Sequence, residues 1–251
     1  MPHTSERVGN HLNLMDLSLV IPVFNEQDNV QPLLEEVRAV LNGRFDYEVI
    51  VVDDGSTDAT AARLMALRAN YPQLRVLRHA ENAGQSTALL SGLLAAQALL
   101  VATLDGDGQN DPADIPALYA VMQADESLWL VGGWRQQRCD SWLKRLSSRV
   151  ANSVRAALLG DATPDTGCGL KLLRREACLQ LPRFDHMHRF LPALVLRAGG
   201  GVRSVPVNHR PRERGVSKYG VFNRLWVGIV DVFGVMWLRR RVLRPDATEV
   251  D

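Results

Sequence analysis

The chain has 251 residues, of which 46% are hydrophobic, so it is long and apolar enough to form one large α/β domain with a complete core. Its formal net charge of +1, without a nucleic-acid recognition motif beside its basic stretches, argues against a nucleic-acid-binding protein. The three cysteines, Cys139, Cys168 and Cys178, have no metal-ligand spacing and form no disulfide framework, which favours the reducing cytoplasm.

The N-terminal segment, residues 1–15, is polar and lacks the apolar stretch of a signal peptide, so we expect it to be disordered. The apolar run Leu17–Val23 that follows is typical of a buried strand. Phe24-Asn25-Glu26 comes directly after this run, and apolar residues at helical spacing then predict a helix over Val30–Leu41. The first strand therefore ends in amide and carboxylate side chains.

A second predicted strand, Tyr47–Val52, ends in the polar segment Asp53–Asp58. Ligands of open α/β sheets bind outside the carboxyl ends of the strands, which makes Asp53 a candidate ligand contact. Ser56, Thr57 or Asp58 can instead cap the helix predicted over Ala59–Asn70. Both roles can hold together. A third strand over Leu74–Arg78 is followed by a helix that begins near Gly84.

The fourth apolar run, Leu99–Leu104, stops at Asp105 and Asp107, two aspartates separated by one glycine. Two carboxylates on such a turn can converge on one Mg²⁺ or Mn²⁺ ion, to which Gln109 adds a neutral oxygen. The alternative is a turn whose carboxylates only accept backbone hydrogen bonds. The spacing thus predicts a divalent metal site formed by Asp105, Asp107 and Gln109.

The remaining elements continue the alternation of strands and helices. We expect helices near Asp114–Gln123, Ser141–Leu159 and His188–Leu196, and strands at Leu128–Gly132, Leu170–Leu173 and Gly201–Val207. Repeated β-α units of this kind imply a mainly parallel sheet with helices on its faces.

The apolar run Leu225–Leu238 is flanked by Arg224 and by Arg239-Arg240-Arg241. It is shorter than the roughly 20 residues that a transmembrane helix needs, and it contains Asp231. With its tryptophans it is typical of a helix at a membrane interface, and a helix packed on the domain or on a partner subunit is the alternative. We therefore divide the chain into disordered residues 1–15, a catalytic domain at 16–222, this helix at 223–244 and a disordered tail at 245–251.

Four segments together resemble the nucleotide-sugar-binding half of inverting GT-A glycosyltransferases of family two: VIPVFNE at 20–26, VVDDGSTD at 51–58, Asn82-Ala83-Gly84 and LDGDGQNDP at 104–112. Further segments, at 142–152, 165–176 and 212–218, resemble the branch that contains dolichol-phosphate mannose synthase and bacterial undecaprenyl-phosphate glycosyltransferases. The resemblance implies a GT-A fold and a Mg²⁺- or Mn²⁺-dependent enzyme. Many relatives continue into two or more transmembrane helices, whereas we expect none in this sequence.

The resemblance also implies roles for single residues. The donor nucleotide sugar is expected to contact Pro22, Val23, Asn25, Glu26, Asp53, Asp54, Gly84 and Asp105. The phosphate of the acceptor is expected at Arg135, Lys144, Arg145, Ser148 and Ser217. Arg212 and Lys218 match a loop that closes over the diphosphate, and they join Asp105, Asp107 and Asp165 as catalytic candidates. Asp165 either orients the acceptor or caps a turn with Thr166, and His188-Arg189 is a further candidate at the cleft edge.

The expected reaction is inverting transfer of a sugar from a nucleotide-diphosphate sugar to a polyprenyl phosphate, giving a lipid-linked monophosphate sugar for envelope glycan or lipid modification. The enzyme would lie peripherally on the cytoplasmic face of the inner membrane, alone, as a homo-oligomer or with a membrane-protein partner. A soluble or glycan acceptor is the first alternative. A sugar-phosphate nucleotidyltransferase is the distant one, because the loop after the first strand, at 23–29, is acidic and lacks glycine.

Overall fold

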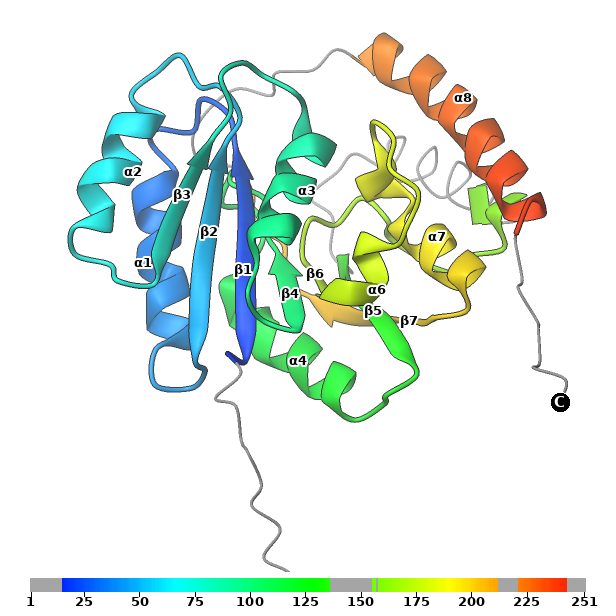
Figure 1. Ribbon diagram of the computed structural model, residues 1–251, viewed down its shortest axis with the longest axis horizontal. Helices are drawn as coiled ribbons and strands as arrows, with labels where there is room; N and C mark the ends of the chain where they lie inside the picture. Colours follow the sequence, from blue (N-terminus) through cyan, green and yellow to red (C-terminus); the bar gives the residue numbers. More distant parts are fainter. Residues whose placement is uncertain (1–14, 136–154, 157, 212–220, 243–251) are drawn as a thin grey trace, which may run out of the picture.

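The computed structural model describes residues 15–135, 155–156, 158–211 and 221–242. Seven strands form one mixed sheet in the order β3-β2-β1-β4-β6-β5-β7 (Figure 1). The strands are β1 (Leu17–Val23), β2 (Tyr47–Asp53), β3 (Leu74–Arg78), β4 (Leu100–Thr103), β5 (Leu128–Arg135), β6 (Lys171–Arg174) and β7 (Gly201–Val207). Each strand expected from the apolar runs is present, with ends that differ by up to three residues.

The sheet is mainly parallel, as the sequence predicts. β1 pairs in parallel with β2 and β4, β2 with β3, and β5 with β7. β6 runs antiparallel between β4 and β5, with Lys171 opposite Thr103 on one side and Gly132 on the other. The insertion of β6 brings the loop before it beside the carboxyl end of β4, where Asp105 follows.

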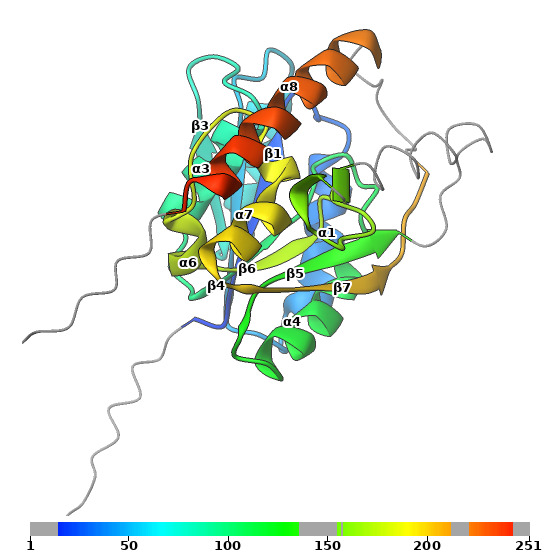
Figure 2. The same ribbon diagram turned by 90° about the vertical axis from the view of Figure 1, so that its right-hand side faces the viewer.

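Helices cover both faces of the sheet (Figures 1 and 2). The helical segments are α1 (Val30–Leu41), α2 (Thr60–Arg68), α3 (Gln85–Ala95), η1 (Pro112–Asp114), α4 (Ile115–Gln123), α6 (Arg175–Leu179), η2 (Met187–Arg189), α7 (Leu191–Ala198) and α8 (Val221–Arg240). Alternate residues of the central strands point to opposite faces, so Leu19 packs with α1 and α4 whereas Val20 packs with α3 and α7. The two faces thus form two hydrophobic clusters separated by the sheet.

The last helix, α8, lies on the second face, beside α7 (Figure 2). Val235 on its inner side is 1% exposed, and the Arg197 side chain of α7 donates to the carbonyl of Leu238 at 2.8 Å. Within the described part of the chain, no helix combines the length and the apolar character needed to cross a bilayer. The boundary expected between domain and helix at residue 222 stays a prediction.

Several expected features lie outside the described residues. These are residues 1–14 of the N-terminal segment expected to be disordered, most of the helix predicted over Ser141–Leu159, and the whole tail at 245–251. Of the cysteines, Cys168 and Cys178 are buried free thiols, and Cys139 lies outside the described residues.

Candidate active site

Asp105 and Asp107 follow β4 at the carboxyl end of the parallel strands, where the sequence predicts them. Oδ1 of Asp105 accepts a hydrogen bond from Nε2 of Gln85, the first residue of α3, at 2.8 Å. Burial, and then the charge of Asp107, raises the pKa of the Asp105 carboxyl to about 6. Two carboxylates that repel each other in a partly buried turn are the environment that a cation relieves.

The donor atoms of this turn fit a hard divalent cation. Oδ1 of Asp107 accepts from the amide of Gln109 at 3.1 Å, and the Gln109 side chain reaches the carbonyl of Arg210 at 3.4 Å. Among the described residues, no group of three or more His, Cys, Asp or Glu side chains is placed to hold a metal. Mg²⁺ is usually held by one or two carboxylates, with water and substrate phosphate in its remaining coordination positions.

The end of β1 lies directly against the turn of Asp105 and Asp107. A Cβ atom at Gly106 would lie 2.9 Å from the carbonyl oxygen of Pro22 and closer still to the side chain of Val23. Glycine at position 106 therefore allows the two strand ends to touch. The predicted donor residues Pro22 and Val23 thus lie beside the predicted metal site.

Asn25 ties the loop after β1 to the loop after β2. It adopts a left-handed conformation, with φ of 53°, and its Oδ1 accepts from the amide of Thr57 at 2.7 Å. Its own amide donates to Oγ of Ser56 at 2.8 Å. The neighbouring amide of Glu26 donates to Oγ1 of Thr60 at 2.9 Å. The two loops expected to bind the nucleotide therefore form one hydrogen-bonded unit.

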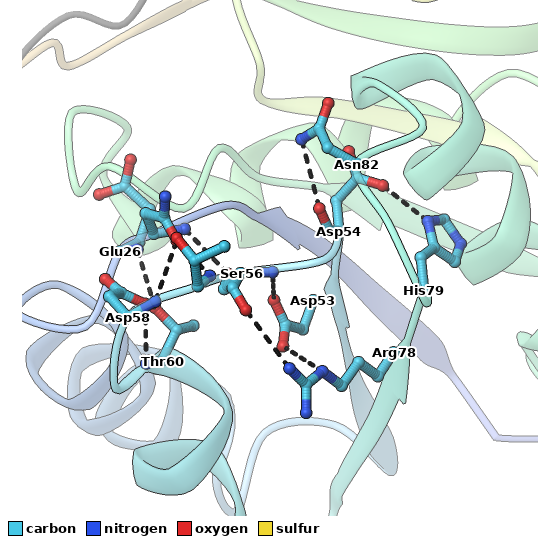
Figure 3. A network of polar contacts seen from close by, with 11 residues as sticks. Glu26, Asp53, Asp54, Ser56, Asp58, Thr60, Arg78, His79 and Asn82 are labelled. Carbon is cyan, nitrogen blue, oxygen red and sulfur yellow. Dashed lines mark hydrogen bonds and ion pairs between the residues drawn. The ribbon is translucent and has the colours of Figure 1, made fainter.

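Asp53 is the last residue of β2, Asp54 follows it, and the two point to different partners (Figure 3). Asp53 is fully buried: its Oδ1 accepts from the amide of Ser56 at 2.9 Å, and its Oδ2 lies 3.3 Å from Nε of Arg78. Asp54 accepts from the amide of Gly84 at 2.8 Å and lies 2.7 Å from Nδ1 of His79. Asp54 thereby fixes the turn that leads into α3, and Gly84 has a φ of +90° there.

The N-cap residue of α2 is Ala59, so none of the three residues expected to cap the helix occupies that position. Asp58 lies one residue earlier. Its Oδ1 accepts from the amide of Thr60, the first residue of α2, at 2.9 Å. One of the three expected capping residues therefore bonds the first turn of the helix.

Arg135 and Asp165 form a two-pronged ion pair. Nε and Nη2 of Arg135 donate to Oδ2 and Oδ1 of Asp165 at 2.6 and 2.8 Å, and Asp165 is 3% exposed. This fork-to-fork geometry is the strongest form of an arginine–carboxylate contact. The structure thus joins a residue expected at the acceptor phosphate to one whose role the sequence left open.

A cavity of about 950 Å³ opens beside Asp105. Its polar lining includes Gln85, Arg155, Lys171, His188 and Arg189, contributed by segments far apart in the sequence. Its apolar lining includes Leu89, Leu158, Leu191, Val232 and Phe233. One space therefore joins the predicted metal site to an apolar wall formed in part by α8.

His188 lies deep in this lining. Its Nδ1 is 2.7 Å from Oγ of Ser86, and burial lowers the pKa of its imidazole to about 3. The side chain is therefore neutral near pH 7. The sequence motif His188-Arg189 thus lies in the same cleft as Asp105.

Sequence reasoning missed Lys171, Arg155 and Gln85, all of which line the cavity. The signal available for Lys171 was its place two residues after Gly169, in the segment that resembles the family. Of the predicted residues, Lys144, Arg145, Ser148, Arg212, Ser217 and Lys218 lie outside the described residues.

Comparisons with known proteins agree with this geometry. The family model described as "Glycosyl transferase family 2" matches residues 18–181. The dodecaprenyl-phosphate galacturonate synthase of Rhizobium johnstonii (strain DSM 114642 / LMG 32736 / 3841) is 40% identical over 237 residues, which is 92% of this chain and 69% of that protein. The undecaprenyl-phosphate 4-deoxy-4-formamido-L-arabinose transferase of Edwardsiella ictaluri (strain 93-146) is 36% identical over 208 residues, covering 82% of this chain. The chain spans 63% of that second relative.

Solved structures share the fold. Glucosyl-3-phosphoglycerate synthase from Mycobacterium tuberculosis, in complex with uridine diphosphate, superimposes with a TM-score of 0.67 over 90% of this chain and 80% of the other, at 21% identity. The same protein in complex with Mn²⁺, uridine diphosphate and phosphoglyceric acid gives a TM-score of 0.67 over 93% of this chain and 80% of the other, at 22% identity. The expected GT-A fold is confirmed.

Proposed function

The chain belongs to glycosyl transferase family 2, and from that premise we propose that it transfers a sugar from a nucleotide-diphosphate sugar to a polyprenyl phosphate, with inversion at the anomeric carbon. The single observation that carries the proposal is the cavity that joins Asp105 to apolar side chains of α8. A metal-binding carboxylate and an apolar wall in one space suit a reaction between a diphosphate and a lipid. The names of the two polyprenyl-phosphate relatives support the same acceptor.

The proposed donor site lies where the ends of β1, β2 and β4 meet. Asp105 and Asp107 would hold a divalent cation, which as a Lewis acid stabilises the negative charge of the leaving diphosphate. The loops of Asn25 and Asp53 would receive the base and ribose, since they border the same end of the sheet. Crystals of the M. tuberculosis structural neighbour with Mn²⁺ or Mg²⁺ support a divalent cofactor.

In the proposed reaction, an oxygen of the acceptor phosphate attacks the anomeric carbon. The bond from that carbon to the diphosphate oxygen breaks, and the nucleoside diphosphate leaves. A phosphate monoester has a second pKa of about 6, so it is largely dianionic near neutral pH and needs little help from a general base. It needs cations that hold it beside another anion, and the predicted set is Arg135, Lys144, Arg145, Ser148 and Ser217.

The proposed location is the cytoplasmic face of the inner membrane, with peripheral attachment through α8. Val230 and Trp237 on the outer side of α8 are 55% and 59% exposed, and Phe233, which also lines the cavity, is 57% exposed. They recur at intervals of three and four residues, and Arg241 lies over the Trp237 ring at 5.7 Å. An apolar stripe beside arginines suits an anionic membrane surface.

The decisive experiment incubates the purified chain with a panel of nucleotide-diphosphate sugars and a short polyprenyl phosphate, with Mg²⁺, Mn²⁺ or EDTA. We expect a polyprenyl monophosphate sugar by mass spectrometry, with inverted anomeric configuration by NMR, and no product in EDTA. Transfer to soluble sugars alone would favour a glycan acceptor. Release of inorganic pyrophosphate from a nucleoside triphosphate and a sugar phosphate would favour a nucleotidyltransferase.

A further inference from the structure

Lys171 is a buried cation in the wall of the cavity. It is the first residue of β6 and is 5% exposed. Its ammonium donates to the carbonyl of Cys168, and among the described residues it forms no ion pair with a carboxylate. A charge removed from water is costly unless an opposite charge lies nearby. Asp105 and Asp165 are the carboxylates whose charges act on Lys171, and both have other partners, so the ammonium is placed to bind an anion that enters the cavity.

The other charges of this region are already matched. Asp165 forms an ion pair with Arg135 through two hydrogen bonds, and Asp161 forms an ion pair with Arg155 at 2.5 Å. Asp105 and Asp107 fit a divalent cation, as argued above. Among these charges, Lys171 is thus the cation whose charge an anionic group of the substrate would neutralise.

A second cation faces the same space from η2. Arg189 lines the cavity, and its charge and that of Lys171 both act on the buried ring of His188. Arg135 is not part of this lining, although it lies next to Gly167, which is. Two cations from different elements, β6 and η2, therefore line the cavity that Asp105 also lines.

The lining becomes apolar on the side of α8. Leu191 of α7 faces the cavity with Val232 and Phe233 of α8. The residues expected to bind base and ribose, Asn25 and Asp53, do not line it. The described lining thus combines the Asp105 carboxylate, the cations Lys171 and Arg189, and apolar side chains in one space, which suits an amphiphile with an anionic head.

We propose that Lys171 and Arg189 seat the phosphate of the lipid acceptor, and that Leu191, Val232 and Phe233 receive the first units of its hydrocarbon chain. This inference rests on the proposed function and deepens it, because it makes α8 part of the acceptor site. A carboxylate on the donor sugar is the other oxyanion that this seat could bind, and the experiment separates the two.

The test compares Lys171→Met and Arg189→Gln with the exposed control Arg183→Gln. Methionine fills a volume like that of lysine, and replacing a buried charge with an apolar side chain is often neutral for folding. We expect a KM for polyprenyl phosphate raised about tenfold or more in the first two variants, as for loss of a charge-assisted hydrogen bond. Affinity for the nucleoside diphosphate with Mg²⁺ should stay within about twofold of the parent, and Arg183→Gln should match the parent in both.

Each variant is assayed with a neutral hexose donor and with a uronic acid donor. An increase in acceptor KM with both donors supports the phosphate seat. A defect confined to the uronic acid donor, or to nucleoside diphosphate binding, overturns it. A parent chain that binds the nucleotide but transfers to no polyprenyl phosphate contradicts the proposed function itself.

A second variant tests the apolar wall. Val232→Ser should raise KM for a prenyl phosphate and leave unchanged the KM for a short alkyl phosphate with the same head group. Val230→Ser, on the outer side of the same helix, is the matched control when both are assayed in detergent solution. Equal effects of Val232→Ser on the two acceptors would overturn the assignment of α8 to the acceptor chain.

Discussion

Asp105 and Asp107 differ in what surrounds them, although one glycine separates them in sequence. Asp105 is held by Gln85 and lies against Gly169, whereas Asp107 bonds the backbone of its own turn. Asp105 is therefore part of the packed interior of the site, and Asp107 is part of its rim. A substitution at the rim is the cleaner probe of the metal.

Asp107→Ala should abolish transfer and leave the fold intact, because it removes one of two predicted metal ligands from a turn. The measurement is initial rate against Mg²⁺ or Mn²⁺ concentration, with thermal unfolding to check the fold. Asp107→Asn, which keeps the shape but loses the charge, should be nearly as inactive. Metal-dependent turnover near the parental rate in either variant would contradict the site.

Arg135→Ala should lower the free energy of unfolding by about 3 kcal/mol, because it leaves the Asp165 carboxylate buried without its partner. It should also raise KM for the acceptor more than for the donor, because Arg135 lies next to Gly167 in the wall of the proposed acceptor cavity. Urea unfolding and the two Michaelis constants are the measurements. Arg203→Ala, which breaks an exposed pair with Asp125, is the control and should cost less than about 1 kcal/mol. Equal stability losses in the two variants would refute the structural role of the pair.

Protonation of His188 should destabilise the protein in mild acid. Burial lowers its pKa from 6.5 to about 3 in the folded state, so the unfolded chain binds the proton first. The contribution is fully present above pH 6.5 and is lost as pH falls toward 3, by about 1.4 kcal/mol per pH unit. His188→Asn should flatten this part of the curve of unfolding free energy against pH. A parental slope in the variant would mean that other groups cause it.

The loop before β6 contacts the end of β4, because Gly169 in this loop lies against Asp105. Its carbonyl accepts from Oγ1 of Thr103 at 2.7 Å, and a Cβ atom there would overlap the Asp105 carboxylate. The insertion of β6 beside β4 is what brings the two together.

Gly169→Ala should therefore displace Asp105 and reduce kcat by about tenfold or more, since an ångström of misplacement is costly in a catalytic site. Gly132→Ala is the control, because its Cβ would meet only Leu130 at an ordinary 3.6 Å. Steady-state kinetics and metal titration of both variants provide the measurement. Parental kinetics in Gly169→Ala would contradict the prediction, because they would show that the loop can move away from Asp105 without loss of activity.

Apolar runs and helical spacing were enough to predict the strands and most helices, because both patterns depend on near neighbours in the chain. β1, β3 and β7 have the predicted ends, as has α1. The antiparallel pairing of β6 was not predictable, because KLLR is too short to reveal its partners. The Arg135–Asp165 pair and the burial of Lys171 follow from that pairing, so the sequence was enough to place Asp105 and Asp107 at the end of a strand but not to reveal the cavity beside them.

At the scale of the whole molecule, α8 has two different sides. Val235 is buried against the domain, whereas Phe233 and Trp237 are more than half exposed. The two alternatives for this segment, a packed helix and a membrane-contacting helix, are thus compatible. Truncation before α8 would uncover the core, so substitutions on the outer side are the better test.

Replacement of both Val230 and Trp237 by serine should reduce co-sedimentation with anionic liposomes and leave thermal stability close to that of the parent. Salt should weaken parental binding without eliminating it, because the apolar contribution is not screened and each arginine near the surface adds about 1 kcal/mol. Met65→Ser removes an equally exposed apolar side chain from α2 and is the control. A parental chain that ignores anionic liposomes would contradict membrane contact.

The double role of α8 has a consequence for how the acceptor is found. If one side of the helix rests on the bilayer and the other walls the cavity, a long-chain phosphate needs to lift only its first units from the lipid. Moving hydrocarbon into water costs about 0.8 kcal/mol per methylene, so extraction of the whole chain would be prohibitive. The search for acceptor then takes place in two dimensions, and the quantity that sets the rate is the mole fraction of acceptor in the membrane plane.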